Sequence, residues 1–271
     1  MIDALFLAAV IAADSPLPAA EVSSLEVPPV VDAALDRLIA QYATLPGVEF
    51  QATHRVMSGS NVVLPEMNRD IIIIKPNKLR IEQNGVPLLV CDGTTAWSTP
   101  KQGTEYDTQS APATLEDCIT TFRQLGSGGI GGSGGLVAAL MSTKPKKMIL
   151  KDMSAVALYE KGDSDLIVLW VGPDSTSLRP GMKLGLFIPR EGPAWPSRLD
   201  IIPPDPRVVT RISFDDWKGT DGADSDFGQP PPLEDRGSIL PGMGKSAIPQ
   251  SGADESESPP VAPTEDAPDS D

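Results

Sequence analysis

A succession of short apolar segments joined by tight turns constrains the fold more than any other feature of this 271-residue chain. Within residues 48–57, apolar and polar side chains alternate, which predicts a strand with one buried face. Asn84-Gly85 predicts a two-residue hairpin turn. Asp92-Gly93, in the stretch LVCDGTTAW, predicts another, because these residues tolerate the positive φ of tight turns. Residues 48–109 are therefore expected to form an antiparallel meander of about six strands.

The remaining segments add helices and more strands without alternating between the two. An amphipathic helix is expected before the meander, from about residue 31 to Tyr42, and two more over residues 114–125 and 136–143. Further strands are expected from residue 146 to residue 217, beginning with KKMILKDM. The pattern predicts an α+β fold, in which a curved antiparallel sheet of about eleven strands is covered by inserted helices.

The N-terminus is expected to direct the chain to the cell envelope. An apolar run from Ala4 to Ala13 is too short to span a bilayer but has the length of the central region of a secretory signal. We interpret residues 1–27 as a signal peptide and Pro/Ala spacer, which predicts a periplasmic or secreted protein with no transmembrane anchor in the mature chain. Because no Lys or Arg precedes the run, either the true start lies upstream or the signal is a weak one.

The C-terminal end carries most of the acidity. The chain has a formal net charge of −15, and residues 219–271 contain 12 acidic and 2 basic residues among many prolines and glycines. Such a segment cannot bury enough apolar surface to offset its ordering entropy, so residues 219–271 are expected to be a disordered acidic tail. The tail is either a solvating segment or a spacer that docks on an envelope protein. A chain this acidic is not expected to bind nucleic acid.

Groups that perform catalysis are scarce in the sequence. The stretch Gly131-Gly-Ser133-Gly-Gly135 matches the G-x-S-x-G pattern of hydrolases, which requires a strand before it and a histidine after it. The only histidine, His54, comes before the motif, and a single His on the apolar face of a strand is typical of a packed core residue. We therefore expect no enzymatic activity, no catalytic residue, no metal site and no cofactor.

Cys91 and Cys118 are the only cysteines of the chain. In an oxidising compartment the two can form a disulfide, and an even number of cysteines permits it. Two buried free thiols are an equally good interpretation.

These features together resemble the periplasmic lipoprotein-carrier superfamily, the LolA/LolB-like proteins. The resemblance covers about residues 28–218. It rests on the order of the elements, on D-G-x-x-x-W in LVCDGTTAW and on the closing stretch WPSRLDIIPPDPRVVTRISFDDW. More narrowly, the chain is similar to a bacterial envelope family of unknown function with that fold. The resemblance implies an incomplete barrel whose apolar concave side takes acyl chains of lipids or lipoproteins, without chemistry, under a lid at residues 114–143. Arg55 is the nearest candidate for the carriers' functional arginine.

An apolar concave face and an apolar lid are expected to form the binding site. The residues expected to line the cavity are Phe50, Ala52, Val56, Leu79, Ile81, Trp97, Leu184, Leu186, Leu199, Ile201, Ile212 and Phe214. Those expected on the lid are Leu115, Ile119, Phe122, Leu136 and Leu140. Apolar side chains suit flexible alkyl chains, since each buried methylene contributes about 0.8 kcal/mol. The alternative is that the lid fills the concavity itself, which leaves an envelope interaction or sensor module with an acidic docking tail.

Overall fold

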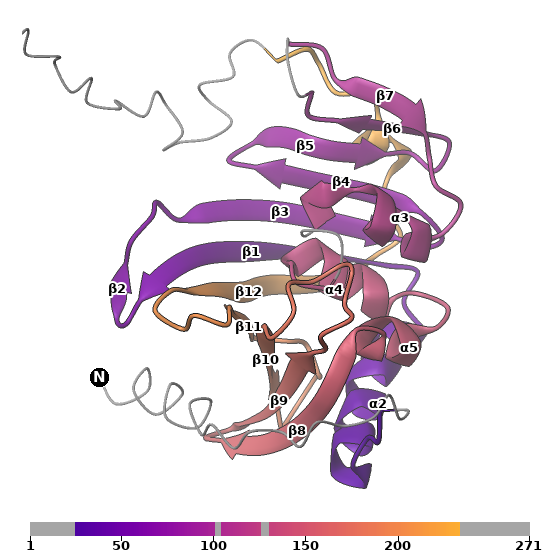
Figure 1. The fold of residues 1–271 in the computed structure, drawn as a ribbon. Coiled ribbons are helices and arrows are strands. Elements are labelled where there is room, and N and C mark those ends of the chain that lie inside the picture. The colour runs from indigo at the N-terminus through magenta and orange to yellow at the C-terminus, as the bar shows by residue number, and fades with distance from the viewer. Residues whose placement is uncertain (1–24, 101–103, 126–129, 234–271) are drawn as a thin grey trace, which may run out of the picture.

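One antiparallel sheet organises the computed structural model, which describes residues 25–100, 104–125 and 130–233. Its strands follow the order β7-β6-β5-β4-β3-β1-β12-β11-β10-β9-β8, and β2 pairs with β1 outside this path. The strands are β1 (Gly47–Ser58), β2 (Asn61–Val62), β3 (Met67–Ile74), β4 (Lys78–Gln83), β5 (Val86–Cys91), β6 (Thr95–Ser98), β7 (Asp107–Ser110), β8 (Met153–Lys161), β9 (Ser164–Val171), β10 (Lys183–Pro189), β11 (Arg198–Ile202) and β12 (Val209–Thr220). The sheet curls from β7 to β8 without closing (Figure 1), which confirms the predicted α+β fold with a curved, open sheet.

Tight turns set the register of the meander where the sequence predicted them. Asn84 and Gly85 join β4 to β5 with φ angles of 53° and 77°, the pair of positive values that a type I′ hairpin turn requires. At the next turn the φ of Gly93 is 96°. The carboxylate of Asp92 accepts hydrogen bonds from the amides of residues 94 and 95. The stretch LVCDGTTAW therefore determines a turn of the fold.

Four α-helices lie among the described residues. They are α2 (Pro29–Ala43), α3 (Leu115–Thr121), α4 (Ser133–Leu140) and α5 (Pro145–Leu150), and two short 3-10 turns are η1 (Arg123–Leu125) and η2 (Asp224–Phe227). Helix α2 starts with a proline in its first turn and buries a stripe that includes Val31, Leu35 and Leu38. Helix α3 is capped by Thr114, whose hydroxyl accepts a hydrogen bond of 3.1 Å from the amide of Asp117.

Residues 146–153 were expected to be a strand, and this prediction was wrong. Most of them form α5, and β8 begins only at Met153. Pro145 lies in the first turn of α5, where its missing amide hydrogen would have had no helical partner. Ile149 is the buried residue of this helix. A short apolar run does not distinguish a strand from one buried helical turn, and the proline favours the helix.

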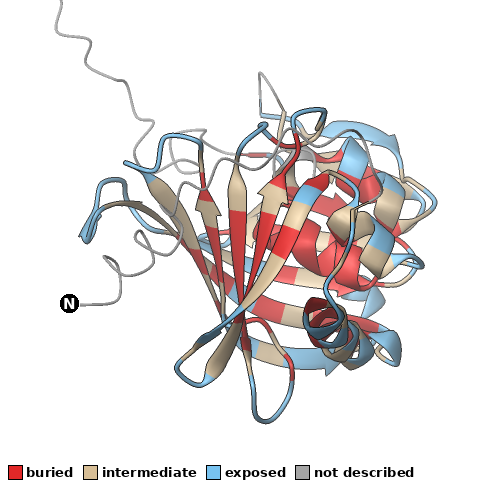
Figure 2. Ribbon diagram, turned by 60° about the horizontal axis from the view of Figure 1, so that its bottom comes forward, coloured by how far each residue is buried: buried red, intermediate tan, exposed pale blue. Residues whose placement is uncertain are grey.

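The concave side of the sheet holds the main apolar core. Alternation along β1 sends Phe50 and Ala52 to this side, next to Ile71 of β3 and Ile81 of β4. The helices add their own apolar residues to the same core, and Figure 2 shows buried segments on the strands and on the helices beside them. All eight residues of α4 are buried.

The opposite, outer side of the sheet is partly covered by the segment after β12, which we call the strap (residues 221–233). Figure 1 shows it behind β4–β6, on the side away from α3. Phe227 of the strap is 2% exposed and packs with Ile74 and Val90. Residues 219–233 thus differ from the disordered tail expected there, because Phe227 has an apolar patch in which to be buried. The rest of that expected tail and the apolar run Ala4–Ala13 lie outside the described residues.

Candidate functional site

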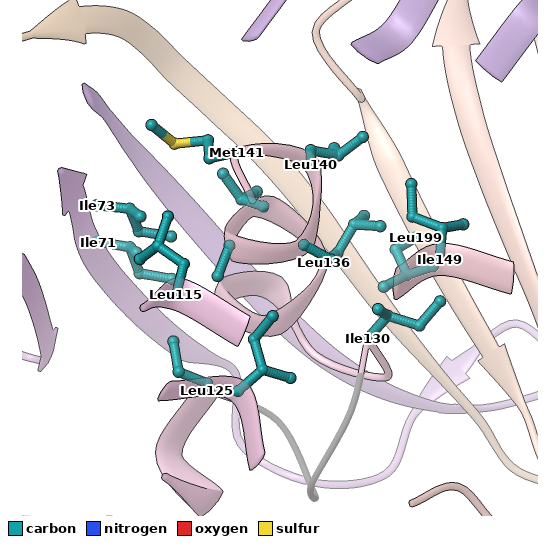
Figure 3. Close-up of a cluster of buried hydrophobic side chains, with 14 of the residues drawn as sticks. Ile71, Ile73, Leu115, Leu125, Ile130, Leu136, Leu140, Met141, Ile149 and Leu199 are labelled. Atoms are coloured by element: carbon teal, nitrogen blue, oxygen red, sulfur yellow. The ribbon is translucent and has the colours of Figure 1, made fainter. Parts of the chain in front are cut away.

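The concave face and the predicted lid form one continuous apolar cluster. Every lid residue belongs to it, as do the cavity-lining residues Phe50, Ala52, Leu79, Ile81, Leu184, Leu186, Leu199, Ile212 and Phe214. Ile201 is half-buried against the same cluster, and Val56 is half-buried near the end of β1. In Figure 3, Leu115 lies beside Ile71 and Ile73 of the sheet, and Leu136 extends towards Leu199. In this conformation the lid therefore occupies the concavity.

Helix α4 packs closely against η1 because a glycine stands at the point of contact. A Cβ atom on Gly134 would lie 2.9 Å from Cδ2 of Leu125 and 3.5 Å from Cδ1 of Ile81. The first contact is too short for an ordinary Cβ atom, so glycine lets α4 pack against Leu125 of η1, whereas the distance to Ile81 of the sheet is an ordinary van der Waals contact. Leu136, Val137 and Leu140 then fill the space beside it. Gly134 therefore has a packing function within the lid.

Trp97 lies on the outer face of the sheet, although it was expected to line the cavity. It pairs with Val90 across β5 and β6 and packs with the outer cluster that contains Phe227. Its neighbour Ala96 takes the inward position and is fully buried in the main core. Because successive side chains of a strand point to opposite faces, only one of the two could face the concavity.

His54 and Ser133 meet beneath the lid, 79 positions apart in the sequence. Nε2 of His54 lies 3.1 Å from Oγ of Ser133, and the two residues are 7% and 0% exposed. Burial, and then the charge of Arg69, lower the pKa of His54 to about 3. A catalytic histidine is instead oriented by a carboxylate, which raises its basicity. The pair is suited to hold α4 on β1, and this geometry does not favour a hydrolase.

Arg69 faces the lid, and it was not among the site residues predicted from the sequence. Its guanidinium donates to Oε1 of Gln83 at 3.3 Å and to the carbonyl of Gln124, in η1, at 3.4 Å. Burial lowers the pKa of Arg69. Arg55, the candidate chosen from the resemblance, pairs instead with exposed Glu66 at 2.7 Å. Period-two counting back from inward-facing Ile71 would have placed Arg69 on the concave face.

Cys91 and Cys118 lie together between β5 and α3. Both are fully buried, and their thiols hydrogen-bond to each other. The thiol of Cys91 also contacts the carbonyl oxygen of Asn77 at 3.1 Å. The hydrogen bond from Cys118 lowers the pKa of Cys91, whereas the same bond and burial raise the pKa of Cys118. Both cysteines are free in this structure.

A groove of about 370 Å³ opens at the seam between α2 and the lid. We call it the seam groove. It is lined by Ile39, Ala43, Lys75, Pro76, Thr114, Leu115, Glu116, Leu140, Met141, Ser142, Thr143 and Pro145. Two of the expected lid residues, Leu115 and Leu140, therefore form part of its wall. At this groove, buried apolar residues of the lid border on an opening to solvent.

A larger groove of about 540 Å³ is lined mainly by outer-face residues such as Asp70 and Arg80. Several of its charged side chains pair with each other, including Arg80 with Glu82 and Lys218 with Glu49. Its polarity does not suit an alkyl chain, so we favour the smaller seam groove.

Within the described ranges, no three His, Cys, Asp or Glu side chains gather as a metal site requires. None of the helices described combines the length and the hydropathy needed to cross a membrane.

Comparison with known proteins gives structural neighbours of low identity. No protein-family model matches the chain, and no curated protein matches it. A LolA superfamily protein from Nitrosomonas europaea is similar at 10% identity, with a TM-score of 0.40, over 73% of this chain and 96% of that one. An uncharacterized conserved protein from Thermus thermophilus is similar at 11% identity, with a TM-score of 0.42, over 74% of this chain and 94% of that one. The lipoprotein LppX from Mycobacterium tuberculosis is similar at 10% identity, with a TM-score of 0.36, over 70% of this chain and 96% of that one.

Proposed function

We propose that this protein is a non-enzymatic, periplasmic or secreted envelope protein that binds acyl chains of lipids or lipoproteins against the concave face of its sheet. The observation that carries the proposal is the plug-like burial of α4, whose eight residues are all buried in the concavity. An apolar trough that receives an apolar helix offers an acyl chain the same kind of surface. Each methylene that takes the place of lid side chains regains about 0.8 kcal/mol.

The polar attachments of the lid are few and reversible. His54 and Ser133 share one hydrogen bond, and the contact of Arg69 with the carbonyl of Gln124 is long. Within the lid itself, the carboxylate of Glu116 accepts hydrogen bonds from the amide and the hydroxyl of Thr143, 2.7 Å each, which join the end of α4 to α3. Each such bond contributes about 1 kcal/mol net. Displacement of α4 by a long acyl chain therefore requires the loss of only a small polar contribution.

Lipid analysis of the native protein tests the proposal. The protein is purified from its own compartment, extracted with organic solvent and analysed by mass spectrometry, and displacement of a fluorescent fatty acid is measured in parallel. We expect a co-purifying acyl lipid and saturable displacement. Leu140→Gln, at the wall of the seam groove, should weaken binding, whereas Val63→Gln on an exposed loop is the matched control. No co-purifying lipid together with no displacement would overturn the proposal.

A second candidate function follows from the same filled concavity. If α4 stays in place, the domain is a closed interaction or sensor module, and the acidic tail would dock on an envelope protein. Hydrogen exchange separates the two: a bound fatty acid should increase exchange across Ser133–Leu140 if the lid opens. Unchanged exchange in α4 at saturating fatty acid would favour the closed module. Truncation after Leu233 should then abolish capture of the protein's envelope partner.

A further inference from the structure

We propose that the seam groove is the head-group site of the ligand, and that it takes a single-chain amphiphile whose head is an anionic oxygen group, a carboxylate or a phosphate. The inference rests on the proposed function and adds to it the chemical class of the ligand and its route under the lid. Three features carry it: the apolar continuity of the groove, the charge of Lys75 and the unpaired hydroxyl of Ser142.

The groove is continuous with the core that the lid covers. Leu115, Leu140 and Met141 line the groove and also belong to the main apolar cluster, with each 2% exposed. Ile39 of α2 and Leu115 of α3 also line the groove, so a chain bound there would contact apolar side chains of both helices. The groove volume of about 370 Å³ holds only part of a long chain. The remainder must extend beneath the lid, where α4 now lies.

Lys75 places a positive charge at this opening. Its ammonium donates to the carbonyl oxygens of Tyr42 and Ala43 at the end of α2, at 3.0 and 3.2 Å. Both acceptors are neutral, and an ammonium group has three donors. Among the described residues, no carboxylate lies within ion-pair distance of this nitrogen. Burial lowers the pKa of Lys75, as expected for a charge without a counter-ion.

Ser142 supplies a second donor on the same groove. Its Oγ is buried, and no hydrogen-bond partner for it lies in the described part of the chain. A buried hydroxyl without a partner loses about 1–3 kcal/mol relative to a paired one. A head-group oxygen that reaches the Oγ of Ser142 when the lid moves, and that also accepts from the third N–H of Lys75, would satisfy both donors. A carboxylate or phosphate has enough lone pairs to do so.

Glu116 adds a negative charge to the same lining, and this gives the proposal a signed test. Its Oε1 is held by the amide and hydroxyl of Thr143, and the hydrogen bonds from Thr143 keep its pKa lowered although burial alone would raise it. An anionic head should therefore be attracted by Lys75 and repelled by Glu116. Neutralising these two residues must change the affinity for an anion in opposite directions, which no general loss of folding can do.

The experiment compares three ligands of equal chain length in displacement of a fluorescent fatty acid: a fatty acid, a lysophosphatidic acid and a monoacylglycerol. A charge-assisted hydrogen bond is worth about tenfold in affinity, so we expect both anions to bind about tenfold tighter than the neutral ligand. Lys75→Met should remove this advantage and leave the monoacylglycerol unchanged, and Lys75→Arg should retain it. Glu116→Gln should strengthen anion binding about threefold. The anion that binds tighter identifies the carboxylate or phosphate source.

The outcomes separate this inference from the function on which it rests. Equal binding of all three ligands, or an anion preference that Lys75→Met does not change, overturns the head-group site and leaves acyl-chain binding in place. Failure of all three ligands to bind overturns both. Circular dichroism and thermal unfolding of each variant exclude loss of the fold, since Lys75 also contacts the end of α2.

Discussion

The two faces of the sheet are covered in physically different ways. On the concave face, α4 inserts eight buried residues and is held by isolated hydrogen bonds such as that between His54 and Ser133. On the outer face, the strap buries one aromatic side chain, Phe227, and is fixed by Lys78, which pairs with Asp224, and by Arg80, which donates to the carbonyl of residue 226. Under the proposed function, an acyl chain is expected to replace the first kind of cover, and the strap is expected to stay in place. The proposed function therefore predicts that the lid is the element that exchanges with a ligand, and the following experiments test this.

The largest effect should follow from loss of a side chain of the lid. Leu136 is 1% exposed at the centre of α4, and Leu136→Ala should lower the free energy of unfolding by about 4 kcal/mol, from lost burial and the cavity left behind. Urea unfolding at constant m-value measures it. Val63→Ala, at a residue that is 48% exposed, should change stability by less than about 0.5 kcal/mol. Equal effects of the two substitutions would contradict the view that α4 is part of the core.

Covalent attachment of the lid should give the next largest effect. With a small-molecule disulfide such as oxidised glutathione, Cys91 and Cys118 exchange to form one disulfide and release two glutathione thiols. Closing a loop of this length should stabilise the domain by about 3 kcal/mol. Mass spectrometry of the unreduced protein should detect the loss of two hydrogen atoms, and urea unfolding should measure the gain. Because both thiols are fully buried, the reaction should be slow unless α3 moves.

Cys118→Ser is the control for this crosslink, since it removes one thiol and leaves the burial of the other. The crosslinked protein should also bind a fluorescent fatty acid more weakly, because α3 carries part of the groove wall. Persistence of two free thiols after unfolding and refolding in the same redox buffer would contradict the expected pairing. The sequence left a disulfide and two free thiols as alternatives, and this measurement distinguishes them.

Alternation along strands could be read from the sequence, and contacts between distant segments could not. The inward positions of Phe50, Leu79 and Ile212 follow from period two, and the hairpin at Asn84-Gly85 follows from local turn chemistry. The contact between His54 and Ser133 joins segments 79 positions apart, which local patterns do not encode. The exclusion of Ser133 as a nucleophile on the ground of chain order therefore overlooked this neighbour, although the low pKa of His54 still argues against catalysis.

The errors at Trp97 and in the strap have a common physical reason. Each prediction depended on the apolar surface against which a single aromatic side chain, Trp97 or Phe227, is buried. Trp97 lies outside because Ala96 takes the inward position. Phe227 orders a segment whose composition otherwise predicts disorder, because an apolar patch on the outer face receives it. The amino-acid composition of a segment is an average over its residues, and it does not reveal that a single residue such as Phe227 can fix the segment to the sheet.

Acid should weaken the lid through His54. The pKa of His54 in the folded protein, about 3, lies below the usual value of 6.5. Between these two pH values His54 is therefore protonated in the unfolded chain and neutral in the folded one. Stability is therefore unaffected above pH 6.5 and falls by about 1.4 kcal/mol per pH unit below it, down to about pH 3. By pH 5 the loss is about 2 kcal/mol. His54→Gln, which retains a polar partner for Ser133, should unfold with a shallower pH dependence, and parallel curves would contradict this origin.

The smallest effect should follow from loss of the strap anchor, and it should be local. Phe227→Ala removes the aromatic side chain between Ile74 and Val90. A fully embedded Phe would cost more, but the strap can detach while the sheet stays folded, so the loss of stability is limited to the strap's own contribution, about 1–2 kcal/mol. Hydrogen exchange should increase in residues 221–233 and not in α4, and fatty acid affinity should be unchanged. An equal increase of exchange in α4 would show that the two covers unfold together, and the distinction between an exchangeable lid and a fixed strap would fail.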